Sequence, residues 1–172
     1  MLCSSFSMTF SPGFRLGWAM PGRHAQRVRS LKLVSSGGVS ELLQITAAEY
    51  LANGGYDRLL RKLRRCYARQ IEAATRIISR HFPPKTRITT PSGGFVLWVV
   101  MPEGADSIAI YEQALKEGIG IAPGPLFSAS GRYRNCMRIN CGVAWSQRTE
   151  QALARVGELA RKALGEPRPA GS

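Results

Sequence analysis

The chain has 172 residues, enough for one domain with a sizeable core. Its formal net charge of +13 raises the possibility of a polyanionic partner, such as nucleic acid, an anionic membrane or a phosphorylated ligand. The interpretation we favour is arginines spread over helix surfaces, because the basic residues do not alternate with aromatic residues over any stretch. The four cysteines form no CxxC pair and only two histidines accompany them, which argues against a zinc site. No apolar run approaches the ~20 residues that a membrane-spanning helix needs, so we expect a cytoplasmic protein with reduced thiols, no metal and no membrane partner.

Residues 5–18 are the first stretch that contains candidate site residues. Their pattern predicts a turn followed by a strand. The hydroxyls of Ser5 and Ser7 lie near each other, and Arg15 stands in an otherwise apolar run. Hydroxyls, turn N–H groups and one guanidinium together suit a phosphate. The alternative is a serine-rich turn before a surface strand whose arginine is solvated.

Three helices are expected next, over residues 23–35, 40–51 and 56–81. Apolar residues cover most of the circumference of the second, so we expect it to be buried on several sides. The third is long and carries a basic face on its exposed side: Arg58, Arg61, Lys62, Arg64, Arg65 and Arg69. This face could bind nucleic acid, in which case the affinity would depend on salt. The interpretation we favour is that it is a solvated helix surface.

After Pro83-Pro84 the pattern changes to short strands and amphipathic helices. We expect strands at 86–89, 94–101, 119–122 and 135–141, and helices at 107–117 and 146–164. A rigid loop is expected at 123–125. This order predicts an α+β layer, a small antiparallel or mixed sheet covered on one face by the two helices.

Residues 5–17 resemble the lysine motif of class I/II aminotransferases, the fold-type I pyridoxal phosphate enzymes; their sequence is SFSMTFSPGFRLG. They are most similar to the aminotransferase-like domain of MocR-type regulators of the GntR family, and the resemblance extends from Ser4 to about Leu164. It implies a partial fold-type I subunit. Residues 1–55 would be a remnant of the large cofactor-binding domain, 56–82 a long linking helix, 83–165 the C-terminal small domain and 166–172 a disordered tail.

The resemblance also implies the cofactor contacts. Ser5, Ser7 and Arg15 correspond to the residues that hold the phosphate of pyridoxal phosphate. The lysine that forms the Schiff base corresponds to Met8, which has neither an amine nor a titratable group. We therefore expect no catalytic residue, cofactor binding that is non-covalent at best, and no transamination by this chain.

Arg138 is the second candidate site residue. A guanidinium on a strand binds a carboxylate through two parallel hydrogen bonds, and the resemblance implies that this arginine grips a substrate α-carboxylate. The alternatives are an arginine facing water or one paired with a local acid. The resemblance further implies an amino acid or amino compound as ligand, a possible homodimer, and DNA binding only through a winged-helix domain that this sequence does not contain.

Overall fold

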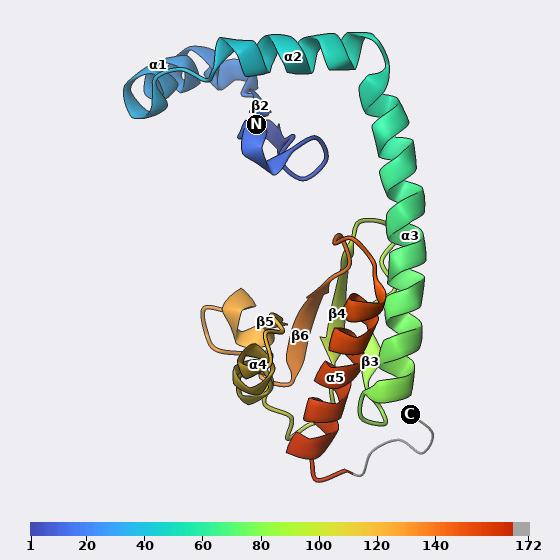
Figure 1. Ribbon diagram of the computed structural model, residues 1–172. Coiled ribbons are helices and arrows are strands. Elements are labelled where there is room, and N and C mark those ends of the chain that lie inside the picture. Colours follow the sequence, from blue (N-terminus) through green and yellow to red (C-terminus); the bar gives the residue numbers. More distant parts are fainter. Residues whose placement is uncertain (167–172) are drawn as a thin grey trace. The chain divides into compact units, whose positions relative to one another are not determined.

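The computed structural model describes residues 1–166, which divide into two compact units, one up to Leu63 and one from Arg64 onward (Figure 1). Each unit is described by itself below. The tail expected over 166–172 lies, from residue 167 onward, outside the described residues. The expected domain boundaries near residues 55 and 82 stay predictions.

The N-terminal unit begins with a hairpin of β1 (Leu2–Ser5) and β2 (Gly17–Met20), which pair antiparallel. A Cβ at Gly17 would lie 2.7 Å from the carbonyl oxygen of Ser4, so the close pairing of the two strands requires a glycine there. The turn and strand predicted over residues 5–18 are both present, but the strand begins only at Gly17. Pro12–Phe14 form the 3₁₀ helix η1 instead, because Pro12 presets a helical φ at its first position.

Two helices follow the short 3₁₀ segment η2 (Gly22–His24): α1 (Ala25–Ser36) and α2 (Glu41–Ala52). The predicted burial of α2 on several sides is wrong for the described residues. Only Ala47 is buried on α2, whereas Leu42 is 72% exposed and Ile45 60% exposed. Helical periodicity identified the element, but no described residue covers the outer apolar side of this helix.

The helix expected over 56–81 is α3 (Gly55–His81), which runs from the first unit into the second. In the C-terminal unit its buried side consists of residues spaced by four, Gln70, Ala74 and Ile78, followed by Phe82. The helix therefore supplies one wall of that unit's core (Figure 1).

The C-terminal unit contains a four-stranded antiparallel sheet in the order β3-β4-β6-β5. The strands are β3 (Arg87–Ile88), β4 (Val96–Val100), β5 (Ala122–Pro123) and β6 (Cys136–Asn140). The α+β prediction is confirmed. The loop expected at 123–125 continues into the 3₁₀ helix η3 (Gly124–Phe127).

Two capped helices complete this unit, α4 (Ser107–Lys116) and α5 (Gln147–Ala163). Ser146, the first residue of the helix predicted over 146–164, is the N-cap of α5, since its hydroxyl accepts a hydrogen bond from the Thr149 N–H at 3.3 Å. The core joins one face of the sheet to α3, α4 and α5; its largest fully buried side chains include Ile78, Phe82, Leu97, Val99, Met101, Ile110, Met137 and Val156. Among the described residues no helix is long and apolar enough to span a membrane.

Candidate functional site

The structure brings Ser5, Ser7 and Arg15 together in the loop that connects β1 to β2. The Arg15 guanidinium donates a hydrogen bond to the Ser7 hydroxyl at 3.3 Å, and the Ser7 N–H donates to the Ser5 hydroxyl at 3.1 Å. Ser5 and Arg15 are exposed and Ser7 is half-buried. The three predicted phosphate contacts thus form one linked polar cluster whose outer side is open.

The backbone of this loop holds Arg15 in an uncommon conformation. Arg15 caps η1 with φ 47° and ψ 34°, the left-handed region that side chains with a Cβ rarely adopt. The next residue, Leu16, is buried and its carbonyl accepts the N–H of Phe6 at 2.9 Å. An anchored Leu16 and a left-handed Arg15 together aim the guanidinium back across the loop toward Ser7.

Met8, at the position that the resemblance assigns to the cofactor lysine, lies on a single tight turn in which the Phe10 N–H bonds the Phe6 carbonyl at 2.7 Å. Its side chain is 61% exposed. Because a thioether has no nucleophilic nitrogen and no titratable proton, this side chain cannot bond an aldehyde carbon or move a proton.

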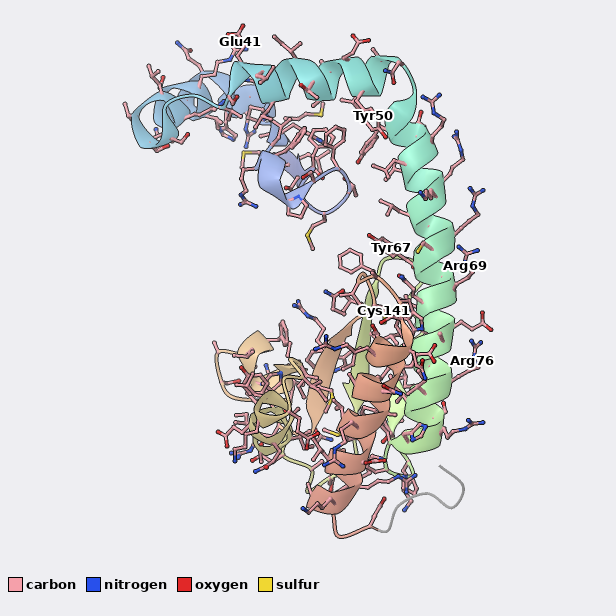
Figure 2. All side chains as sticks on the ribbon, in the orientation of Figure 1. Glu41, Tyr50, Tyr67, Arg69, Arg76 and Cys141 are labelled. Atoms are coloured by element: carbon pink, nitrogen blue, oxygen red, sulfur yellow. The ribbon has the colours of Figure 1, made fainter. Side chains whose placement is uncertain are left out.

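Aromatic rings of the same loop pack against tyrosines of α2 and α3. The Phe6 and Tyr56 rings pack edge to face at 5.7 Å, and the Tyr56 hydroxyl hydrogen-bonds Thr9 at 2.9 Å. Phe10 packs against Tyr50 with ring centroids 4.9 Å apart, and Figure 2 shows Tyr50 projecting toward this loop. These contacts stabilise the loop that carries the polar cluster by packing it against α2 and the start of α3.

The charge of the surrounding sequence suits an anion. No Asp or Glu occurs before Glu41, whereas this stretch holds four Arg and one Lys after Phe14: Arg15, Arg23, Arg27, Arg29 and Lys32. A phosphate bound at the hydroxyls of Ser5 and Ser7 would lie near the Arg15 guanidinium, and residues 1–40 contain no carboxylate side chain that could repel it. The residues present therefore fit a phosphate group.

Arg138 belongs to the other unit, on β6, where it is exposed. It stands opposite Trp98 on β4 and Ala122 on β5, so the three share one face of the sheet. Its guanidinium carbon lies 4.7 Å from the centroid of the Phe127 ring. Within the described residues its side chain makes no hydrogen bond or ion pair. The alternative that Arg138 is paired with a nearby Asp or Glu therefore finds no support among these residues.

An aromatic cluster surrounds that arginine. The Trp98 ring packs edge-on against Phe127 at 5.5 Å and against Tyr133 at 5.6 Å. Sequence reasoning missed these three rings as site residues, because they come from a strand, a 3₁₀ helix and a loop. The only signal was that Phe127 follows the Pro123-Gly124-Pro125 turn.

Arg138 also lines a half-open cavity of about 340 Å³ beside the edge of β6. The remaining lining is mostly aliphatic or aromatic, and it consists of Ile119, Gly120, Ile121, Ala122, Ile139, Asn140, Val143, Trp145, Thr149, Ala152, Leu153 and Val156. Arg138 is the one charged side chain among these described lining residues. Ile139, Leu153 and Val156 belong to the core, on the face of the sheet opposite to the one that Arg138 shares with Trp98, so the guanidinium and the apolar lining lie on different faces.

The six cations of the basic face on α3 are all exposed, and Figure 2 shows Arg69 projecting away from the sheet of its unit. None of the six makes a hydrogen bond or ion pair within the part of the chain that the structure describes. Among the described residues there is also no group of three His, Cys, Asp or Glu side chains that could hold a metal ion.

Comparisons with known proteins agree with the fold. No protein-family profile matches the chain. The uncharacterized HTH-type transcriptional regulator YjiR of Escherichia coli is 39% identical over 164 residues, which are 95% of this chain and 35% of YjiR. LysN, the α-aminoadipate aminotransferase of Thermus thermophilus, superimposes with a TM-score of 0.85 at 28% identity, covering 95% of this chain and 42% of LysN.

The chain is homologous to MocR-type HTH regulators and to pyridoxal phosphate aminotransferases. A third relative, the aromatic-amino-acid aminotransferase 1 of Thermococcus litoralis, is 26% identical over 93% of this chain and 39% of that protein. The chain thus spans between a third and a half of the length of these relatives. The match is consistent with the C-terminal part of a fold-type I aminotransferase-like domain, and the resemblance inferred from residues 5–17 is confirmed.

Proposed function

We propose that this aminotransferase-like segment binds pyridoxal phosphate through Ser5, Ser7 and Arg15 without a covalent bond, and contributes to sensing an amino compound rather than to transamination. The observation that carries the proposal is the linked Ser5–Ser7–Arg15 cluster around an exposed Met8. The cluster supplies phosphate donors, while the position that would supply an amine holds a thioether.

Two relatives support a proposal about the role of this chain. YjiR is an HTH-type regulator and LysN an aminotransferase that was solved with N-(5'-phosphopyridoxyl)-L-leucine. We propose that the present chain works in the cytoplasm as the ligand-binding part of a MocR-type regulator or of an aminotransferase-derived protein. Its ligand would be an amino acid or amino compound held at Arg138, it could form a homodimer, and DNA would be bound only by a winged-helix domain outside these 172 residues.

A titration with pyridoxal phosphate tests the cofactor site. We expect saturable binding that inorganic phosphate displaces and that Arg15→Gln weakens at least tenfold, because a charge-assisted hydrogen bond is worth about 1.5–3 kcal/mol. Arg23→Gln, which removes an exposed arginine outside the cluster, is the matched control and should leave the affinity unchanged. Equal affinities in Arg15→Gln and the parent chain would sink the assignment of these residues.

Borohydride reduction tests the absence of a covalent bond. The tryptic peptide of residues 1–15 contains no lysine, so a phosphopyridoxyl group found at position 8 by fragmentation can arise only in Met8→Lys. We expect such a group in Met8→Lys and none at that position in the parent chain. Turnover of added amino acids by the parent chain would contradict the proposal.

A basic nucleic-acid-associated protein remains the second candidate, favoured by the six exposed cations of the basic face on α3. That function predicts binding of random DNA with a steep dependence on salt. Absence of a gel shift at moderate salt would remove it.

A further inference from the structure

We propose that a cavity between α3 and the turn that connects β3 to β4 is a binding site for a small phosphate monoester. The cavity has a volume of about 450 Å³ and belongs to the C-terminal unit (Figure 1). It is lined by Arg64, Tyr67, Ala68, Ile71, Pro91, Ser92, Gly93 and Gly94. This lining includes neither the Ser5–Ser7–Arg15 cluster nor Arg138, so the inference does not rest on the function proposed above.

Three side chains in the lining have unused hydrogen-bond donors. The Arg64 guanidinium, the Tyr67 hydroxyl and the Ser92 hydroxyl make no hydrogen bond or ion pair among the described residues. A phosphate group accepts hydrogen bonds through three terminal oxygens, and a guanidinium can donate two parallel bonds to such a group. One arginine and two hydroxyls therefore match the oxygens of one phosphate.

The turn itself adds backbone donors. Within the described residues no carbonyl accepts the N–H groups of Ser92, Gly93 and Gly94. Gly94 has a φ of 88°, and a Cβ at Gly93 or Gly94 would meet no atom within 4 Å. Open space thus borders this backbone, so a phosphate can approach the turn closely, as it does at other glycine-rich turns.

The local charge favours an anion. Residues 58–102 contain one acidic residue, Glu72, and the Arg76 guanidinium lies 2.6 Å from its carboxylate. No Asp or Glu belongs to the lining of the cavity. A dianionic phosphate would therefore enter surroundings with an excess of positive charge, which attract it more strongly than a neutral ligand.

The remaining wall of the cavity is apolar. Ala68, Ile71 and Pro91 contribute to it, and the Tyr67 ring is held by Phe95, with ring centroids 5.1 Å apart. A volume of about 450 Å³ is typical of small-molecule sites. A phosphate ion alone would fill only part of this volume and would leave the apolar wall without a partner. The lining therefore suits a phosphate carried on a short apolar or aromatic group.

NMR spectroscopy of the full chain tests the site with phenyl phosphate as the probe. The amide resonances of Gly93 and Gly94 report locally on this cavity, so they separate it from binding at the Ser5–Ser7–Arg15 cluster. We expect phenyl phosphate to shift both resonances saturably. It should bind about tenfold more tightly than inorganic phosphate or phenol, because only phenyl phosphate offers both a phosphate and an apolar ring.

Variants of α3 separate the cavity from the general charge of the helix. Arg64→Gln should weaken phenyl phosphate about tenfold, and Tyr67→Phe, which keeps the ring, about two- to fivefold. Arg65→Gln is the matched control, since Arg65 is also exposed on α3 and does not line the cavity. This control should leave the affinity unchanged.

Three results would overturn the proposal: unshifted Gly93 and Gly94 resonances, equal affinities for phenyl phosphate and inorganic phosphate, or equal losses in Arg64→Gln and Arg65→Gln. Equal losses would mean that the cations of α3 attract anions as a diffuse charge and not through the cavity. Arg15→Gln should leave the two glycine shifts unchanged. Failure of the cavity and failure of the cofactor site are therefore distinguishable.

Discussion

The Arg138 guanidinium rests on the face of the Phe127 ring, with 4.7 Å between the guanidinium carbon and the ring centroid. Because Phe127 is itself packed edge-on against Trp98, the aromatic face is held by the sheet and in turn orients the cation. Phe127 is therefore a positioning residue for the candidate carboxylate site.

Replacing that ring tests the positioning role. We expect Phe127→Leu to weaken binding of an amino acid at Arg138 by about two- to fivefold, since a partly exposed cation–π contact is worth about 0.5–1 kcal/mol. Phe127→Tyr should retain the parent affinity, and Leu126→Ala, at a neighbouring side chain that is 72% exposed, is the control. Dissociation constants from calorimetry would decide; a Phe127→Leu variant indistinguishable from the parent chain would refute the role.

The close approach of α5 to the end of α3 gives a stability prediction. A Cβ at Gly157 would lie 2.7 Å from Phe82 Cδ2 and 2.8 Å from the His81 carbonyl oxygen. We expect Gly157→Ala to destabilise the fold by about 1–3 kcal/mol, despite the better helix propensity of alanine, because the backbone of His81 cannot yield easily.

Urea unfolding of Gly157→Ala measures that change in the free energy of unfolding. Gly93→Ala is the matched control, because a Cβ at Gly93 would meet no atom within 4 Å. A Gly157→Ala chain as stable as the parent chain would show that the two helices can move apart without cost.

Asp106 makes the start of α4 sensitive to acid. A hydrogen bond from the Arg134 guanidinium, at 2.5 Å, holds the pKa of the Asp106 carboxyl below its usual value, and this carboxylate also caps α4 by accepting the Ile108 N–H at 2.9 Å. A depressed pKa contributes stability that is present above the unfolded pKa, near pH ~4, and is lost as the pH falls through the folded pKa.

We therefore expect Asp106→Asn to lower the free energy of unfolding at pH 7 by about 0.5–1 kcal/mol, since the pair is largely exposed. The difference from the parent chain should shrink as the pH falls below 4. Glu103→Gln, which removes one exposed carboxylate nearby, is the charge-matched control. A difference that persists unchanged at low pH would contradict the role of the Asp106 charge.

The cysteines should differ sharply in reactivity. Burial raises the pKa of the Cys141 thiol to about 11, whereas Cys3 is exposed. At pH 8 only about one Cys141 thiol in a thousand is then a thiolate, the form that reacts. A thiol reagent followed by peptide mapping should label Cys3 at least a hundredfold faster than Cys141, with the rates converging in urea. Comparable rates in the folded chain would contradict this burial.

Much of the C-terminal unit was predictable because its signals are local. Ser146 before an amphipathic run predicted the start of α5, and the apolar run after Gly94 predicted β4. The burial of α2 could not be predicted, because periodicity shows which residues share a side of a helix and not whether anything covers them.

The sequence by itself determined that position 8 holds a thioether and that hydroxyls and a guanidinium flank it, since these are facts of residue identity and spacing. That the family has an amine at this position stays an implication of the resemblance. Only the tertiary structure decided what surrounds Arg138. Trp98 lies beside Arg138 because the register of β4 and β6 pairs the two residues, and Phe127 contacts Arg138 because η3 packs onto the sheet. Such long-range contacts depend on how the whole unit packs. The aromatic surroundings of Arg138 are a product of that packing.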